Sequence, residues 1–550
     1  MGFLNKARIL ASLSMVSLAA FSAAEPSAKP DIRIGVVSDV HMRNEPGFDA
    51  TFLKALRWFD CEKTDIVIVP GDLTDQAMNS QLEHFMRCWR DVFPDDRRSD
   101  GGKVERLFIT GNHDDEGAIY AAATCNGFAP STLAKTLERP GIKPQSLVYG
   151  ITNAIAKARH AVMANIPSDK SADVLAEMDD FEAKVVAATN LADIAALVGE
   201  AGTLQTNATA LFYAENFATN MPVVWKRVFN EEWGLFLHKR VKGYDFIGVN
   251  WQFSAHVYNA QKLRRFIESL DLPPDRPFFY VQHPHPRGTC HGPNVWGQDS
   301  GYSTNVLSGF PNAILLSGHS HTMLTDERAI WQGAFTSIGC ASIYYLDKPP
   351  GTQITPQKME GGAHGLLIEV FGDRIAVHRH DFFNDEPLGP DWSFPAVWRE
   401  GEPRPYSPEA RAAVVETPQF SQDARLQVNT SGQKDFRHGR PWRIAVSVPL
   451  FAVGKGYNNL AEMEFSLVKV ADSGKSDVIG TKRVLPGKSY WSRSHWEGAF
   501  TAEFTFHAFR DLEDGTVLRV TARPCNAFGG KGDAMISENL VLGGTTASMP

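Results

Sequence analysis

The chain has 550 residues, of which 43% are hydrophobic and 21% charged, a composition that excludes wholesale disorder. Its formal charge of −8 offers no broad basic surface, so a nucleic-acid partner is disfavoured. A chain of this length has room for several domains.

The amino terminus has the pattern of a secretory signal. Lys6 and Arg8 precede an apolar stretch from Ile9 to Phe21, and the small residues Ser22-Ala23-Ala24 follow. We therefore predict a signal peptide over residues 1–24 and an exported protein, periplasmic or extracellular; a retained membrane anchor is the alternative. No later apolar run is long enough to span a bilayer. Six cysteines could pair in such a compartment, but their spacing defines no pairing and we assign no disulfide.

The next part of the chain alternates predicted strands with predicted helices. Apolar, β-branched runs predict strands at Asp31–Val37 and Asp65–Val69, and helical spacing appears over Phe48–Phe59 and Gln81–Val92. A third apolar run covers Leu107–Ile109. Each of the three runs leads into a polar signature, in order Asp39-Val40-His41, Gly71-Asp72-Leu73-Thr74-Asp75 and Gly111-Asn112-His113-Asp114.

Residues 115–240 interrupt this alternation. Much of the segment is alanine-rich and polar, as in Ser171–Glu200, which favours helices. We predict a helical cap beside the site. The cap could be a lid that restricts substrate size or contacts the phosphate, or it could be a packed insertion that never touches substrate, and the sequence leaves both open.

Strands resume after the insertion. We predict strands at Tyr244–Trp251 and Phe278–Gln282, a helix over Asn259–Leu270, and later strands near Ile314–Ser317, Ala334–Ile338, Gly365–Val370 and Arg374–His380. Two of these strands again precede histidine-rich loops, which are Gln282-His283-Pro284-His285-Pro286 and Gly318-His319-Ser320-His321.

The composition changes near residue 386. Recurrent prolines over 386–419 predict an extended linker. Beyond it, over 420–550, short β-rich runs alternate with glycine and polar turns, which predicts an all-β sandwich of immunoglobulin or fibronectin type. The runs are Ala424–Val428, Trp442–Val448, Glu462–Val470, Phe500–Phe506 and Val517–Thr521. The aromatic residues Trp491, Trp496 and Phe500 fit the core of this domain better than a glycan- or lipid-binding face.

The five polar loops share one chemical character. They supply carboxylate, amide and imidazole donors and no thiolate, a set that suits a pair of hard or borderline metal ions. Each loop follows an apolar run, and open α/β sheets bind ligands at the carboxyl ends of their strands. One such loop alone would be an ordinary turn, whereas all five in order indicate a dinuclear metal hydrolase.

Over residues 31–385 these motifs resemble the calcineurin-like metallophosphoesterase superfamily. The resemblance implies an α/β fold of four layers, in which two packed mixed sheets are flanked by helices. It also implies that Asp39, His41 and His321 hold one metal, that Asn112, His283 and His319 hold the other, and that Asp72 bridges them. His285 competes with His283 for one position; we prefer His283, because it directly follows the strand.

The resemblance further implies the roles of neighbouring residues. A hydroxide formed from water between the metals would attack phosphorus, and His113 would protonate the leaving group. Asp114 and Asp75 would orient the ligand loops. Arg43 and Asn44, just past the first motif, are candidates for substrate binding because of their position.

We therefore expect a hydrolase of small-molecule phosphate esters, with diesters slightly ahead of monoesters. Iron, manganese and zinc all suit the donor set. Asp75 stands where purple acid phosphatases carry a tyrosine ligand, so a purple iron–tyrosinate site is not expected. The alternative function is a periplasmic or surface binding protein whose β-sandwich recognises a glycan or envelope component and whose metal site is vestigial. The sequence does not define the oligomeric state.

Overall fold

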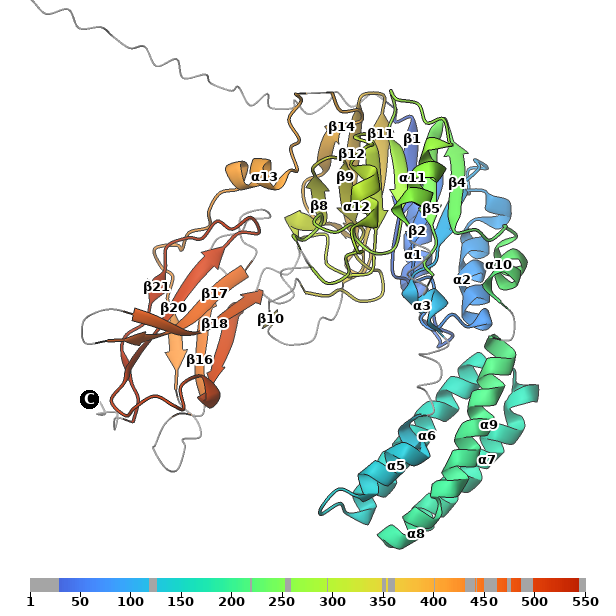
Figure 1. Cartoon of the computed structure of the whole chain (residues 1–550), viewed down its shortest axis with the longest axis vertical. Helices are drawn as coiled ribbons and strands as arrows, with labels where there is room; N and C mark the ends of the chain where they lie inside the picture. Colours follow the sequence, from blue (N-terminus) through green and yellow to red (C-terminus); the bar gives the residue numbers. More distant parts are fainter. Residues whose placement is uncertain are drawn as a thin grey trace, which may run out of the picture.

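The computed structural model describes residues 29–543 except for 118–125, 218–219, 253–258, 294, 349–352, 355–361, 400, 431–440, 442, 450–461, 472–475 and 486–497. The predicted signal peptide, Trp491 and Trp496 lie outside the described residues. A layered α/β body carries a helical projection on one side and a β-rich domain on another (Figure 1).

The first sheet of the α/β body has the strand order β13-β12-β11-β1-β2-β3, in which β13 is Glu386–Pro387, and β14 (Trp392–Pro395) also pairs with β12. Its parallel centre is β1 (Ile32–Val36), β2 (Ile66–Pro70) and β3 (Glu105–Ile109). The chain returns to this sheet more than two hundred residues later with β11 (His364–Phe371), which pairs antiparallel to β1, and β12 (Arg374–Asp381). The central strands are apolar at almost every position because they are covered on both faces.

The second sheet has the order β4-β5-β6-β7-β9-β8. Its strands β5, β6, β7 and β9 are mutually parallel, and β4 and β8 pair antiparallel at the two edges. The bounds are β4 (Phe236–Val241), β5 (Tyr244–Val249), β6 (Phe278–Val281), β7 (Ala313–Ser317), β8 (Ile330–Gln332) and β9 (Thr336–Gly339).

Facing side chains of the two sheets form one core, which includes Ile34, Ile68, Phe279 and Leu316. Helices α1 (Ala50–Cys61), α2 (Asn79–Val92) and α10 (Met221–Phe229) cover the outer face of the first sheet. Helices α11 (Ala260–Glu268) and α12 (Tyr302–Leu307) cover the second sheet. The four-layer α/β architecture expected from the sequence is therefore confirmed.

The insertion between β3 and β4 forms a helical bundle with its own core, which contains Ile155, Val162, Phe181 and Ala208. Its helices are α5 (Pro130–Leu137), α6 (Pro144–Asn165), α7 (Ser168–Ala187), α8 (Leu191–Ala196) and α9 (Val198–Asn216), and they project from the sheet edge that carries α3 (Asn112–Asp115) (Figure 1). None of the described helices is both long enough and apolar enough to cross a bilayer, and this includes the longest, α6 with 22 residues.

The segment expected to be an extended linker is more ordered than its prolines predict. Its first residues form β13 (Glu386–Pro387) and β14 (Trp392–Pro395), both on β12. Edge strands accept proline because one side of the strand needs no ladder hydrogen bond. Helix α13 (Pro408–Val414) follows, with proline in its first turn and the Ser407 hydroxyl accepting a hydrogen bond from Ala410 N as the N-cap.

Two antiparallel sheets make up the C-terminal domain. The smaller is β15 (Gln427–Asn429), β16 (Arg443–Pro449) and β19 (Ala499–Thr505), and the larger contains β17 (Glu462–Val470), β18 (Ser476–Leu485), β20 (Val517–Cys525), β21 (Met535–Ile536) and β22 (Leu540–Val541). Phe500 belongs to their shared core, as expected. The polar strand β18 has too little apolar alternation to be predicted. Strand β10 (Gln353–Ile354), from the segment between β9 and β11, pairs parallel to β18.

Candidate metal centre

The five polar loops converge at one end of the two sheets. Asp39 and His41 follow β1, Asp72 follows β2, and Asn112 begins α3 directly after β3. From the second sheet, His283 follows β6, and His319 and His321 follow β7. Parallel strands put their carboxyl ends at the same edge, so loops far apart in sequence become neighbours.

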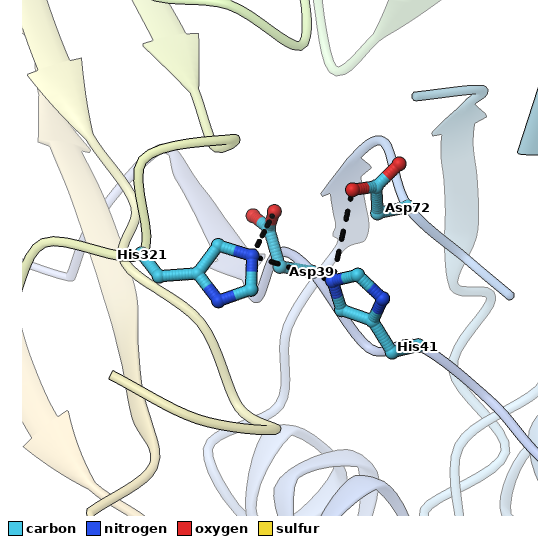
Figure 2. A group of neighbouring side chains, drawn as sticks. All are labelled: Asp39, His41, Asp72 and His321. Atoms are coloured by element: carbon cyan, nitrogen blue, oxygen red, sulfur yellow. Dashed lines mark hydrogen bonds and ion pairs between the residues drawn. The ribbon is translucent and has the colours of Figure 1, made fainter. Parts of the chain in front are cut away.

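The first group of donors consists of Asp39, His41, Asp72 and His321, all of them buried (Figure 2). Nε2 of His321 lies 2.9 Å from Oδ1 of Asp39 and 3.3 Å from Nε2 of His41. Nε2 of His41 lies 3.6 Å from Oδ2 of Asp72. Burial raises the pKa of Asp39, but neighbouring His321 more than compensates and lowers it.

A second group lies against the first and shares Asp72 with it. Nε2 of His283 lies 3.2 Å from Oδ2 of Asp72, 3.1 Å from Oδ1 of Asn112 and 3.1 Å from Nδ1 of His319. The seven residues expected to be ligands are thus brought together, with Asp72 between the two groups. This is the arrangement that a bridging carboxylate requires.

The hydrogen bonds of the histidines indicate that cations fit here. A carbonyl oxygen only accepts, so the bonds of His321 Nδ1 to Tyr345 O (3.0 Å) and of His283 Nδ1 to Pro70 O (2.8 Å) place the ring protons on Nδ1. In the neutral rings both Nε2 atoms then point lone pairs at carboxylate oxygens. Acceptors that face one another repel unless a proton or a metal ion lies between them.

The charges at the centre also indicate that cations fit here. Burial lowers the pKa of His283, but the Asp72 carboxylate outweighs burial and raises it to about 9. Burial lowers the pKa of His319 to about 3. Without metal, a proton on His283 partly neutralises Asp72, and a bound cation would have to displace it.

Backbone strain concentrates at the same residues. Asp39, His41, Asp72, His319 and His321 all have positive φ, between 46° and 69°. Non-glycine residues rarely adopt this left-handed conformation, which costs roughly 1 kcal/mol or more for each residue. Strain shared by five of the seven predicted ligands is typical of a functional site.

Asp114 fastens two of the loops together. Its buried carboxylate accepts hydrogen bonds from Leu73 N (2.9 Å), Thr74 N (2.8 Å), Thr74 Oγ1 (2.7 Å) and Gly111 N (2.9 Å). Burial and the nearby Asp72 charge raise its pKa to about 6. The geometry agrees with the loop-orienting role expected from the sequence.

His113, expected to be the general acid, lies beside the first group. Its ring is 4.6 Å from that of His41, edge to face, and its Nδ1 donates to Asp75 O at 2.8 Å. The Asp75 carboxylate lies 3.3 Å from Nδ1 of His41 and 3.2 Å from Nε of Arg43. Asp75 therefore contacts both histidines, His113 through its backbone carbonyl oxygen and His41 through its carboxylate.

His285, the other histidine of its loop, has a different environment. Its two ring nitrogens lie 2.6 Å from the hydroxyls of Ser317 and Ser320, which flank His319. Because both nitrogens of His285 contact hydroxyl groups, the geometry favours His283 as the ligand. His285 instead contacts the loop that carries His319.

The two residues expected to bind substrate are placed differently. Arg43 lines a cavity next to Asp75, with its guanidinium 5.2 Å from the ring of Tyr344. The Asn44 amide instead donates to Ser80 Oγ (2.8 Å) and to Asn165 Oδ1 of the cap (2.9 Å). Asn44 therefore joins the α/β body to the cap.

Aromatic side chains that sequence analysis did not single out surround the centre. The half-exposed Tyr345 lies 4.1 Å from the ring of His321, and the exposed Trp296 stacks on His319 at 4.9 Å. Trp251 lies 5.8 Å from His319. Only Trp251, at the end of a predicted strand, had a signal that could have identified it.

Comparison with known proteins finds a family match for part of the chain. Residues 32–157 match the sequence model of the calcineurin-like phosphoesterase family, which confirms the resemblance drawn from the motifs. No curated protein sequence matches the chain.

Several solved structures are similar in part. A dimetal phosphatase from Danio rerio is 13% identical, with a TM-score of 0.30, over 67% of this chain and 100% of that chain. A conserved uncharacterized protein from Streptococcus pneumoniae, a predicted phosphoesterase, is 11% identical, with a TM-score of 0.23, over 66% and 97%. A purple acid phosphatase from yellow lupin is 11% identical, with a TM-score of 0.32, over 66% and 54%.

Proposed function

We propose that this chain is an exported dinuclear-metal hydrolase that cleaves phosphate esters of small molecules, diesters ahead of monoesters. The observation that carries the proposal is the position of Asp72, whose carboxylate is shared by two converging groups of donors. The family match supports a phosphoesterase, and the proposal adds the class of substrate, the export and the roles of individual residues.

Asp39, His41, Asp72 and His321 would hold one cation, and Asp72, Asn112, His283 and His319 the other. When bound, two divalent or trivalent cations would activate a water molecule for attack on phosphorus and stabilise the charge on the phosphoryl oxygens. Iron, manganese or zinc would fit the donors.

The chain's own residues hold the reaction geometry. The backbone N–H of His113 donates to Oδ1 of Asp72 at 2.9 Å, and the His113 ring is fixed through its Nδ1 bond to Asp75 O. Proton transfer to the leaving oxygen would then use Nε2 of His113, a contribution of about 10²–10⁴-fold. Asp114 holds the loops of Asp72 and Asn112 in register.

The test combines metal analysis with hydrolysis of bis-p-nitrophenyl phosphate and p-nitrophenyl phosphate. Wild-type protein reconstituted with each metal should bind two ions and cleave the diester faster than the monoester. Asp72→Asn should lose at least one ion and more than about 100-fold in rate, since even outer-sphere partners of metal ligands contribute 10–100-fold. Asp275→Asn, at an exposed loop position, is the matched control. Fewer than one ion per chain after loading would refute the proposal and favour a binding protein.

A further inference from the structure

A cavity of about 450 Å³ lies between the α/β body and helix α6 of the cap. Arg43, Glu45 and Asp75 line it on the side of the α/β body. Helix α6 forms the opposite wall with Lys157 and His160. Neither the motifs nor the family match assigns a role to this cavity.

The cavity adjoins the candidate metal centre through Asp75. Asp75, which lines it, also accepts the hydrogen bond from Nδ1 of His113 and lies beside His41. A general acid has to be next to the oxygen that it protonates. Because Asp75 borders both His113 and the cavity, a leaving group that extends from the centre toward the cap would enter the cavity.

The α6 wall combines space with positive charge. Ala156 and Ala161 also line the cavity, and helical spacing places them on the same face as Lys157 and His160. The short alanine side chains leave space for the cavity, and the two basic side chains border it. Among the described residues Lys157 has no ion-pair partner, whereas Arg159, on another face of α6, pairs with Asp179 and Glu182.

The acidic residues of the cavity lie on the other side. The Asp75 carboxylate is compensated by Arg43, whose Nε lies 3.2 Å away. Glu45 contributes one further negative charge near Arg43. A ligand that reaches from His113 to the cap therefore meets side chains of both charges first and the basic side chains of α6 last.

Hydrogen bonds between the α/β body and the cap fix the position of the α6 wall. The Asn44 amide bridges Ser80 of α2 and Asn165 at the end of α6, and Ser80 also bonds Asn216 of α9 at 3.3 Å. Binding groups on fixed elements lose less entropy when they take up a ligand.

We propose that this cavity is the leaving-group subsite and that it selects phosphate esters whose leaving group carries a second acidic group, a carboxylate or a phosphate, recognised by Lys157 and His160 of α6. The inference rests on the proposed function, because it names the class of substrate for the same centre. Both acidic groups offer oxygen acceptors to an ammonium or imidazole donor.

The test compares two esters of similar shape, 4-carboxyphenyl and 4-carbamoylphenyl phosphate, and their methyl diesters. Wild-type protein should have the higher kcat/KM for the carboxylate esters. In Lys157→Ala the ratio of the two kcat/KM values should fall about three- to tenfold, the effect expected for one partly exposed charge contact, and in Lys157→Glu it should fall further. Lys135→Ala, an exposed lysine of α5 outside the cavity, should keep the wild-type ratio. An unchanged ratio in Lys157→Glu, or a wild-type preference for the amide, would overturn the inference.

A second measurement separates this inference from the proposed function. Saturation-transfer NMR of the metal-free chain should detect 4-hydroxybenzoate more strongly than 4-hydroxybenzamide, and Lys157→Glu should remove the difference. If metal-loaded protein cleaves none of the esters, the proposed function fails, and the NMR comparison alone decides the subsite. Equal signals for the two ligands would overturn the subsite even if every ester is cleaved.

Discussion

Replacing Gly71 by alanine should release one metal ion without unfolding the protein. Gly71 has φ +94°, and a Cβ built on it would lie 2.4 Å from Nδ1 of His283 and 2.7 Å from Cγ of the same ring. An ordinary contact begins near 3.4 Å, so the ring must move by about 1 Å. Metal–ligand distances tolerate only about 0.2 Å. The displaced ring cannot keep its place beside Asp72 and Asn112.

Gly101 provides a matched control. It has a similar φ of +83°, and a Cβ there would meet nothing within 4 Å. Alanine at either position adds left-handed strain of about 1–2 kcal/mol. Only Gly71→Ala also disturbs the His283 bond to Pro70 O, worth about 0.5–1.5 kcal/mol, and adds the strain of the crowded ring. We expect Gly71→Ala to be less stable than Gly101→Ala by about 1–3 kcal/mol.

The assay is metal stoichiometry after reconstitution, followed by urea unfolding of both variants without metal. Gly101→Ala should bind two ions, and Gly71→Ala one. Two ions bound by Gly71→Ala with wild-type affinity would refute the assignment of His283 as a ligand. Equal unfolding free energies for the two variants would refute the predicted contact.

Three further predictions concern residues other than the predicted metal ligands. Asp114→Ala leaves four buried donors without an acceptor and should lower the free energy of unfolding by about 3–5 kcal/mol. Urea unfolding measures the change, and a loss below about 1 kcal/mol would contradict the role of Asp114 in holding the two loops together. Burial lowers the pKa of His378, but Asp391 and Glu369 outweigh burial and raise it to about 9, above the usual 6.5. The stability that protonated His378 gives to the fold is therefore complete below pH 6.5 and is lost as pH rises through 9. His378→Gln should remove about 1 kcal/mol of this pH-dependent stability, discounted for solvent exposure, and an unchanged pH profile would contradict it. Asn44→Ala should speed hydrogen exchange in the C-terminal turns of α6 by cutting the link to Asn165, and unchanged exchange there would contradict the tether.

Much of the α/β body was predictable because its signals are local. Strands such as β1 and β6 are continuous apolar runs, and α1 repeats buried positions at Phe52, Ala55, Leu56 and Phe59 with helical spacing. The short edge strands and the polar strand β18 were missed. They have no such pattern, because pairing with a neighbouring strand rather than their own side chains defines them.

The sequence by itself determined which residue types follow which strands, and hence the donors of the candidate centre and their metal chemistry. Only the tertiary structure decided how these loops meet. It placed Asp72 between two groups, gave both ring nitrogens of His285 hydroxyl partners, turned Asn44 into a tether and opened a cavity between Arg43 and Lys157. The physical reason is distance along the chain. Motifs follow from the conformations of neighbouring residues, whereas contacts between Asp72 and His283, or Arg43 and α6, exist only after two sheets and a cap have packed together.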